Sequence, residues 1–502
     1  MLRFDGVIQT GFGWADFSIS DLEVYSLDAG VFVYGSSGIN GGLSVYELHS
    51  GALASSYDQR VFSSSIINRV GNEISPVIMN GEVHLVLGVD NAAGLVSYGI
   101  DSDGGIGSPE ETSGLGGSTA LTSAVTLASG ALAIAHENGA ISTYTVQTGG
   151  ALSFENSFSA SVLDMQNLQI EGQEFLVTLE EGSALGLYAV DAASHVISAE
   201  DQLTQGAGVG ISSPTAMEVV QAYGASWVIV AGSASHSLSV MRVDSTEGLV
   251  PVDHILDTLH TRFGSVQDIA AVTVNGRVFI VAGGGDDGLS LLTLAPDGRL
   301  IYLDSFEDTL QTGLQNVEAI AASYIGDELQ IFASSQEDQG LTQMSVSLSN
   351  IGQVIQGAGD LSGTSGDDMI VAGDGVTALD GGAGDDILMS GEGAATLTGG
   401  LGADVFVMRA GSDATTITDF MAGTDSLDLT DYALLRNTGQ LTVTSTGTGA
   451  DVTYYDEVVH LRSAGGGSLS SYDIFGAEFT GIDRAFFSET SNGNGDGGGG
   501  GS

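Results

Sequence analysis

Apolar and polar residues alternate in short runs over the first 350 residues of the chain. A run such as "VHLVLG" or "RVFIVAG" follows a glycine, and after a polar loop comes a second run such as "LVSYGI" or "LSLLTL". Alternation with a period of two is typical of β-strands, and the 3.6-residue period of a helix is nearly absent. The pattern therefore predicts an all-β domain.

The glycines that precede the first run recur at intervals of roughly 50 residues. They are Gly30, Gly81, Gly130, Gly172, Gly224, Gly276 and Gly326. Short strands and turns at this period predict a seven-bladed β-propeller over residues 1–350. A β-sandwich and an open β-solenoid are the alternatives, and the regular period favours the propeller.

The seventh repeat lacks its last strand, and the start of the chain supplies a candidate for it. "MLRFDGVIQTG" at the N-terminus is similar to "RLIYLDSFEDTLQTG" at 299–313, which is an outer strand and its exit. We expect residues 2–8 to complete the last blade and to remove an exposed sheet edge.

The pattern changes at "GTSGDDMIVAGDGVTALDGGAGDDILMSGEGAATLTGGLGADVFV" (363–407), which divides into five segments of nine residues. Position four is always glycine, which allows a tight turn, and position eight is always apolar. The apolar residues are Ile370, Leu379, Leu388, Leu397 and Phe406. We call each nine-residue segment a nine and number the nines in chain order. Stacked copies, with two nines per coil, predict a parallel β-roll with this apolar column as its core. A glycine-rich linker without metal is the alternative, but a linker has no need of an apolar residue at position eight of every segment.

Position six alternates between aspartate and a residue without a carboxylate. It reads Asp368, Thr377, Asp386, Ala395 and Asp404. With two nines per coil, the three aspartates lie along one edge of the roll, where carboxylate and carbonyl oxygens form the environment that Ca²⁺ prefers. The predicted calcium ligands are Gly363, Ser365, Asp368, Gly381, Ala383, Asp386, Gly399, Leu401 and Asp404. The opposite edge is expected to hold no such site, although Asp374 and Glu392 lie there.

Charge and composition narrow the function classes. The chain has 502 residues, a formal net charge of −52 and 11 basic residues, all of them arginine. Such a protein repels nucleic acid and anionic membranes and attracts cations. There is no cysteine, so disulfides and thiolate metal sites are excluded. No apolar run approaches the ~18 residues of a membrane span, and the opening residues do not form a signal peptide.

The nines resemble the GGxGxDxUx repeat of RTX proteins, the hemolysin-type calcium-binding exoproteins. "GGAGDDILM" and "GGLGADVFV" match in full, and "ITDFMAGTDSLDLTDY" (417–432) is similar to the segment that follows the roll in secreted metalloproteases. The resemblance covers roughly residues 360–487. It implies export by the type I secretion machinery with an uncleaved signal near the C-terminus, an extracellular location, and folding on extracellular calcium.

The expected organisation is a propeller (1–350), a linker (351–362), a calcium-binding β-roll (363–407), a β-rich cap and secretion region (408–488), and a flexible glycine-rich tail (489–502). The chain ends in "SNGNGDGGGGGS", whereas the family's secretion signal lies at the extreme C-terminus. Either the signal lies near residues 472–487, or the natural protein continues beyond residue 502.

Catalytic motifs are missing from the sequence: there is no H-E-x-x-H, no G-x-S-x-G and, without lysine, no P-loop. The loop between the second and third strands of each blade is polar and is the expected ligand face. Its candidate residues are Asp90, Glu137, Glu180, Glu181, His236, Asp286, Asp287, Glu337 and Asp338. The propeller is therefore expected to recognise an unidentified extracellular ligand or surface. The alternatives are a metal-dependent hydrolase of a lactone, ester or sugar and a loop ring that is merely solvated.

Overall fold

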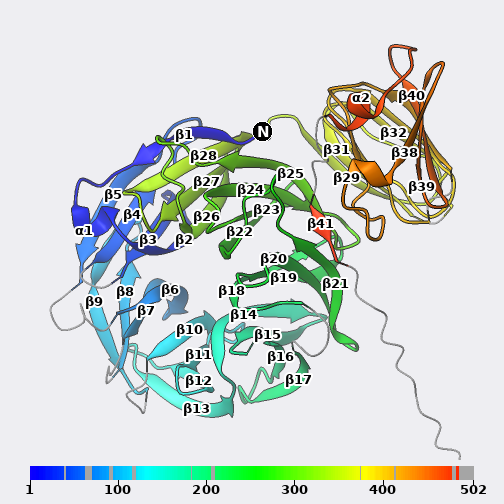
Figure 1. Ribbon diagram of the computed structural model, residues 1–502. Coiled ribbons are helices and arrows are strands. Elements are labelled where there is room, and N and C mark those ends of the chain that lie inside the picture. The colour runs from blue at the N-terminus through cyan, green and yellow to red at the C-terminus, as the bar shows by residue number, and fades with distance from the viewer. Residues whose placement is uncertain are drawn as a thin grey trace, which may run out of the picture.

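The computed structural model describes residues 1–485 except 39–40, 63–69, 90–93, 116–119, 183, 205–209, 374, 412–413 and 477–481. Asp90, Asp374 and the tail at 489–502 lie outside the described residues. The prediction of an all-β chain with a seven-bladed propeller followed by a β-solenoid is confirmed (Figure 1).

Each blade is an antiparallel sheet whose first strand is innermost. Blade 1 has β2 (Ile19–Leu27), β3 (Gly30–Ser37), β4 (Gly42–Glu47) and β5 (Ser55–Val61). Blade 2 has β6 (Val70–Met79), β7 (Glu82–Val89), β8 (Gly94–Ile100) and β9 (Ile106–Ser113). Blade 3 has β10 (Leu121–Thr126), β11 (Leu132–His136), β12 (Ala140–Val146) and β13 (Leu152–Ser159). Blade 4 has β14 (Val162–Ile170), β15 (Gln173–Glu180), β16 (Ala184–Val190) and β17 (Ile197–Leu203).

Blade 5 has β18 (Pro214–Ala222), β19 (Ala225–Gly232), β20 (Ser237–Asp244) and β21 (Gly248–Leu256). Blade 6 has β22 (Val266–Val274), β23 (Arg277–Gly284), β24 (Gly288–Leu294) and β25 (Leu300–Glu307). Blade 7 has β26 (Val317–Ile325), β27 (Glu328–Ser335) and β28 (Leu341–Ser347). The turn residues Asn80, Gly81, Asn275 and Gly276 all have positive φ, which explains why Asn-Gly occurs at these hairpins.

The N-terminal strand completes blade 7, as the sequence similarity predicts. β1 (Arg3–Ile8) pairs antiparallel with β28, with Ile8 opposite Leu341 and Arg3 opposite Ser345. The short helix α1 (Gly13–Asp16) connects it to blade 1. Ile8 and Leu2 are buried, so the strand contributes apolar contacts as well as hydrogen bonds to the closed ring.

Aspartates in the outer strands connect neighbouring blades. Each follows a β-bulge, and its Oδ2 accepts a hydrogen bond from the backbone N–H near the start of the next blade's outer strand. The pairs are Asp58 with Ile106 (3.0 Å), Asp201 with Leu249 (2.8 Å), Asp253 with Leu300 (2.8 Å) and Asp304 with Leu2 (2.6 Å). A recurring acid in the outer strand is therefore a structural feature of the ring.

The roll has two parallel sheets. One, which we call the docking sheet, contains β29 (Ile351–Gly357), β31 (Asp367–Ala372), β33 (Ile387–Met389), β35 (Val405–Val407) and β37 (Ser426–Asp428). The other begins with β30 (Leu361–Ser362), β32 (Ala378–Ala383), β34 (Thr396–Leu401) and β36 (Thr415–Phe420). Met369 pairs with Ile387, and Ile387 pairs with Val405. This register means that each coil holds two nines, as expected.

Residues 351–362, expected to be a linker, instead form β29 and β30 of the roll. Their apolar residues explain the difference, because Ile355 and Leu361 pack against the core that contains Ile370, Leu388 and Phe406. The apolar column predicted from position eight is this core.

The C-terminal part caps the far end of the roll. Three antiparallel strands continue the second sheet, because the last of them pairs with β36. They are β38 (Thr442–Thr446), β39 (Gly449–Tyr454) and β40 (Glu457–Ser463). It is accompanied by the 3-10 helix η2 (Thr438–Gln440) and the helix α2 (Ser471–Phe475). The chain then returns to the propeller, where β41 (Asp483–Arg484) pairs with β21 (Figure 1).

Candidate calcium edge and propeller channel

The three position-six aspartates form one buried column on the roll. Asp368, Asp386 and Asp404 are 0%, 0% and 1% exposed. The backbone N–H of Asp368 donates to Oδ1 of Asp386 at 2.8 Å, and that of Asp386 donates to Oδ1 of Asp404 at 3.0 Å. Oδ1 of each later aspartate therefore accepts a hydrogen bond from the backbone of the preceding turn. We call this column with its flanking turns the calcium edge.

The second carboxylate oxygens differ along the column. Oδ2 of Asp368 accepts hydrogen bonds from the backbone and hydroxyl of Thr364. Oδ2 of Asp386 is buried and has no hydrogen-bond partner among the described residues. A buried carboxylate oxygen without a donor is costly unless a proton or a cation satisfies it. The middle of the column is therefore the place where a proton or a cation would satisfy a buried oxygen.

The pKa values reflect this environment. Burial, together with the neighbouring carboxylates, raises the pKa of Asp386 to about 7 and the pKa of Asp404 to about 6. Backbone hydrogen bonds to each carboxylate oppose the shift without cancelling it. The charged forms of these groups are thus destabilised in the absence of a counter-ion.

Glycine at position one leaves space for oxygens beside each turn. A Cβ at Gly363 would collide with the Gly381 carbonyl and Oδ2 of Asp368. A Cβ at Gly381 would likewise collide with the Gly399 carbonyl and Oδ2 of Asp386. At both positions a carboxylate oxygen converges with a carbonyl oxygen of the next turn, and these are the ligand types that Ca²⁺ prefers.

The other predicted ligands are less uniform. Ser365 is exposed and Ala383 is partly buried in the same two turns. The carbonyl of Leu401 accepts a hydrogen bond from Gly384 N at 2.8 Å, although the Leu401 side chain is exposed. Among the described residues, no group of three or more His, Asp or Glu side chains converges on one point. A cation at the calcium edge would therefore depend on backbone carbonyls for many of its ligands.

The column also includes an aspartate that sequence reasoning missed. Asp404 N donates to Oδ1 of Asp425 at 3.2 Å, and Met421 N donates to Oδ2 of Asp425 at 2.7 Å. Asp425 lies 21 residues after Asp404 instead of 18, so the nine-residue count does not reach it. The signal was the "GTD" of Gly423–Asp425, which follows the last nine.

The opposite edge of the roll lacks this arrangement among its described residues. Thr377 donates from Oγ1 to Oδ1 of Asp360 at 2.9 Å in an exposed pair, and Ala395 is buried. Glu392 is exposed. The difference between the edges follows the difference at position six.

The predicted ligand-face residues of the propeller do not form one cluster. Glu180 is buried and accepts hydrogen bonds within blade 4 from Tyr188, Thr178 and Gln202. His236 accepts from Ser265 N at 2.8 Å, and Asp287 accepts from Asn316 N at 3.0 Å. The contacts of His236 and Asp287 join their loops to the connection that enters the next blade, whereas those of Glu180 stay within blade 4.

The remaining ligand-face residues are mostly open to solvent. Glu137, Glu181 and Glu337 are exposed, and Asp338 accepts a hydrogen bond from Ser335. Asp286 differs, because its Oδ1 is buried without a partner among the described residues. Burial and the neighbouring Asp257 raise the pKa of Asp286 to about 6.

A second group of acids, which sequence reasoning missed, lines a cavity of about 330 Å³ formed by the inner strands. We call it the channel; its acids are Asp21, Glu23, Glu73, Asp164, Glu218 and Asp268. Three of them follow a bulge at the same place in β2, β14 and β22. The repeated signal is visible in "SISDLEV", "SVLDMQN" and "SVQDIAA".

The channel aspartates have structural partners. Oδ2 of Asp21 accepts from Ile74 N at 2.6 Å, and Oδ2 of Asp268 accepts from Ile320 N at 2.6 Å, in each case from the next blade. Burial is the main cause that raises the pKa of Asp21 and Asp268 to about 7 and of Glu218 to about 8. The channel is thus held by aspartates that join blades, with glutamates beside them.

Comparison with protein families gives one match. The family described as "Peptidase M10 serralysin C terminal" matches residues 326–464. The match begins within blade 7 and covers the roll and most of the cap, so the C-terminal part of the chain is similar to the corresponding region of that family. No curated protein matches the chain. No helix among the described residues is long and apolar enough to cross a membrane.

Solved structures resemble the propeller at low identity. Virginiamycin B lyase from Staphylococcus aureus is 12% identical, with 69% of this chain and 100% of that chain covered and a TM-score of 0.45. A putative 6-phosphogluconolactonase from Bacteroides fragilis is 11% identical, with coverages of 63% and 96% and a TM-score of 0.45. The WD40 β-propeller domain of Doa1 is 13% identical, with coverages of 69% and 97% and a TM-score of 0.44. Similarity at this level carries no information about activity or ligand.

Proposed function

We propose that the chain is a secreted calcium-binding protein of the RTX type, whose C-terminal roll folds fully when it binds extracellular Ca²⁺. The unpartnered Oδ2 of Asp386 carries this proposal, because it lies buried between two further carboxylates of the same column. The similarity of residues 326–464 to the serralysin C-terminal region supports it.

The residues of the calcium edge would bind the ion as follows. Asp368, Asp386 and Asp404 would supply carboxylates, and Gly381 and Gly399 would supply carbonyls. Bound calcium would neutralise carboxylates whose repulsion otherwise opposes folding of the edge. Because extracellular calcium modules bind with Kd values of about 10⁻⁴–10⁻³ M, the edge would remain empty inside a cell and fill outside it.

Calcium titration of the full chain, followed by calorimetry and circular dichroism, tests the proposal. We expect saturable binding with a gain of β-structure and of thermal stability. A chain that neither binds Ca²⁺ at millimolar concentration nor changes its melting temperature would rule the proposal out.

Export by a type I system and an extracellular location belong to the same proposal. They are supported by the serralysin-type region and by the acidic composition of the chain. Expression beside a type I transporter should place the protein in the medium. Its retention in the cell, when a known substrate of that transporter is exported, would contradict this part.

We propose that the propeller is a recognition module for an extracellular ligand or surface. Among its described loop residues, His236 and Asp287 accept hydrogen bonds from the connection that enters the next blade, and the channel residues Asp21 and Asp268 accept hydrogen bonds from the next blade. No observation favours hydrolysis over recognition. Asp286 is the loop residue that we choose for the test, because its side chain is partly exposed on this face.

Binding to an array of extracellular glycans and proteins, compared for the wild type and Asp286→Asn, tests the module and its face together. A ligand that binds the wild type and loses affinity for the variant supports the assignment. A ligand that binds both equally would place recognition elsewhere on the propeller.

A further inference from the structure

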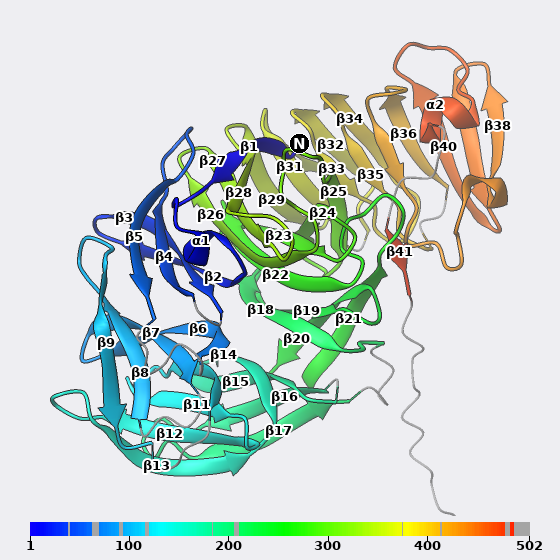
Figure 2. The same cartoon turned by 60° about the vertical axis from the view of Figure 1, so that its left-hand side comes forward.

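The docking sheet of the roll packs against blade 6 of the propeller (Figure 2). The contact is apolar: Met369, Val371, Ile387, Met389 and Val407 from the roll cluster with Ala295, Ile301 and Leu303 from the propeller. All five roll residues are at most 6% exposed. They occupy positions seven and nine of the odd nines, which point away from the interior column at position eight.

The two outer faces of the roll also alternate in sequence: odd nines place apolar residues on one face, and even nines place mostly polar residues on the other. Positions seven and nine of the even nines are Ala378, Asp380, Thr396 and Thr398. Asp380 and Thr396 are exposed, and Ala378 is the one apolar residue among these four described positions, so this face offers little apolar surface to bury. The nines that keep the aspartate are therefore also the nines that contact the propeller.

The outer strand of blade 6 is adapted to this contact. Ile301 pairs with Thr293, and the matching positions of blades 3 and 4 are Ser153 and Ser198. The bulge residue Leu303 corresponds in the same way to Glu155 and Glu200, both of which are exposed. Blades 3 and 4 thus have polar residues where blade 6 has apolar ones, whereas blade 5, whose outer strand pairs with β41, has Val250 and Val252 there.

A polar contact connects the propeller directly with the calcium edge. Arg277, at the start of β23, is buried and donates from Nη1 to the carbonyl of Asp367 at 3.5 Å. Its guanidinium also lies over the ring of Phe279, 5.2 Å from the centroid. Asp367 immediately precedes Asp368, so the propeller holds the backbone beside the first carboxylate of the column.

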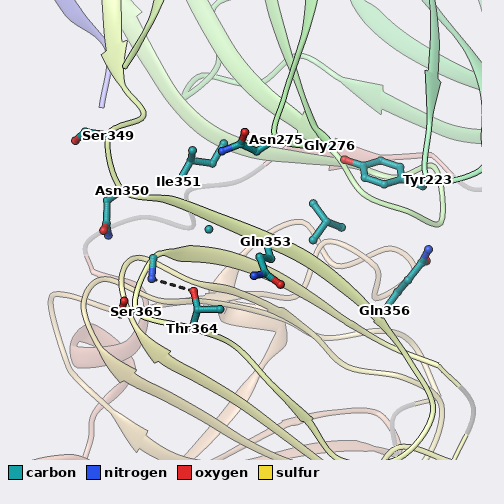
Figure 3. Close-up of a pocket in the computed structure, with 13 residues that line it drawn as sticks. Tyr223, Asn275, Gly276, Ser349, Asn350, Ile351, Gln353, Gln356, Thr364 and Ser365 are labelled. Atoms are coloured by element: carbon teal, nitrogen blue, oxygen red, sulfur yellow. Dashed lines mark hydrogen bonds between the residues drawn. The ribbon is translucent and has the colours of Figure 1, made fainter. Parts of the chain in front are cut away.

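The contact ends at an open cleft of about 840 Å³ between the two domains (Figure 3). Tyr223 and Asn275 line it from the propeller, and Gln353, Gln356 and Thr364 line it from the roll. Its polar residues mark the rim of the interface. The apolar contact is thus concentrated on the propeller-facing side of β31, β33 and β35. These strands follow the turns of the calcium edge.

We propose that docking on blade 6 and calcium binding are thermodynamically coupled, so that the propeller increases the calcium affinity of the roll. The inference rests on the proposed calcium function. Each odd nine contributes a turn to the edge and a strand to the interface, so an ion that fixes the turns also fixes the register of the docked strands. A roll that is already docked loses less conformational freedom when the ion binds. By linkage, calcium must strengthen docking by the same factor.

Two substitutions on the propeller side test the coupling in the full chain. Ile301→Asp and Ala295→Asp place a charge in the apolar contact, and neither residue belongs to the calcium edge. We expect each variant to bind Ca²⁺ at least about fivefold more weakly in calorimetry. Ser198→Asp is the matched control, because it makes the same kind of change at the equivalent exposed position of blade 4, and it should bind like the wild type.

The wild type provides a second measurement that does not depend on a variant. Calcium should slow amide hydrogen exchange at residues 300–303 of β25, which bind no ion, and chelation should increase the maximum dimension in small-angle X-ray scattering. Unchanged exchange at 300–303 on saturation with calcium would overturn the coupling, as would interface variants with the affinity of Ser198→Asp. A wild type that binds no calcium would instead refute the proposed function.

Discussion

Arg484 forms a buried ion pair with Asp253, a residue 231 positions earlier in the chain. Nε donates to Oδ1 at 2.7 Å and Nη2 donates to Oδ2 at 3.2 Å. Asp253 also accepts from Leu300 N, and Arg484 also donates to Thr430 Oγ1 at 2.9 Å. One ion pair therefore connects blade 5, blade 6 and the cap.

Replacing Arg484 by methionine should destabilise the protein. The variant leaves Asp253 buried without its cation, a change that typically costs about 3–5 kcal/mol. Chemical unfolding of Arg484→Met measures the loss. Adding Asp253→Asn should recover part of it, because the second change removes the unpaired charge. A loss of equal size in the single and double variants would mean that the ion pair itself is not the cause.

The column predicts unequal effects of aspartate substitution on calcium binding. Asp386→Ala should remove more binding than Asp368→Ala, because Asp386 has a column aspartate on both sides, whereas Asp368 lies at the end of the column. Thr377→Ala, on the opposite edge, is the matched control and should have no effect. Calorimetric titration gives the number of ions and the affinity for each variant. Equal losses from Asp386→Ala and Thr377→Ala would exclude the alternating-edge interpretation.

Deleting residues 1–9 should leave β28 as an exposed sheet edge. We expect a melting temperature lower by roughly 5 °C and faster aggregation, because the deletion removes the β1–β28 ladder and the burial of Leu2 and Ile8. Arg3→Ala is the control, because the Arg3 ion pairs are largely exposed and should contribute little. An unchanged melting temperature for the deletion would contradict the role of β1 in closure.

The channel predicts a stability that depends on pH. Burial raises the pKa of Glu218 from 4.5 to about 8, so the folded state holds more protons than the unfolded state between these values. The stability from the protonated group is present below pH 4.5 and is lost as the pH rises toward 8. Glu218→Gln mimics the protonated form, so it should change little at pH 5 and should stabilise the protein by about 2 kcal/mol at pH 9.

Urea unfolding at the two pH values, with calcium chelated, measures this difference. Glu181→Gln is a suitable control, because Glu181 is exposed outside the channel. If Glu218→Gln had the same effect at both pH values, proton binding by Glu218 would not explain it.

The fold could be predicted from the sequence because it depends on features that repeat along the chain. The turn glycines, the alternating runs and the apolar column at position eight each repeat a local requirement of the backbone. The N-terminal strand could be placed because residues 1–11 repeat the pattern of 299–313.

The parts that sequence analysis missed depend on contacts between distant segments. Asp425 follows a change of spacing, and Arg484 finds its partner only after the cap returns to blade 5. Glu180 had a suitable position in the loops, but its hydrogen bonds to Tyr188 and Gln202 make it part of blade 4. In contrast, Ile301 and Leu303 carried a readable signal, because blades 3 and 4 have polar residues at those positions.

Ring closure by β1 also determines when the propeller can be completed. The hydrogen bond from Arg3 to Ser345 spans 342 residues, so the contact order of blade 7 is among the highest that the domain allows. Bringing these ends together costs chain entropy before any blade 7 contact offsets it. Until β1 pairs, β28 has an unpaired edge. The pairing of β1 with β28 is therefore the contact of the propeller that chain entropy penalises most.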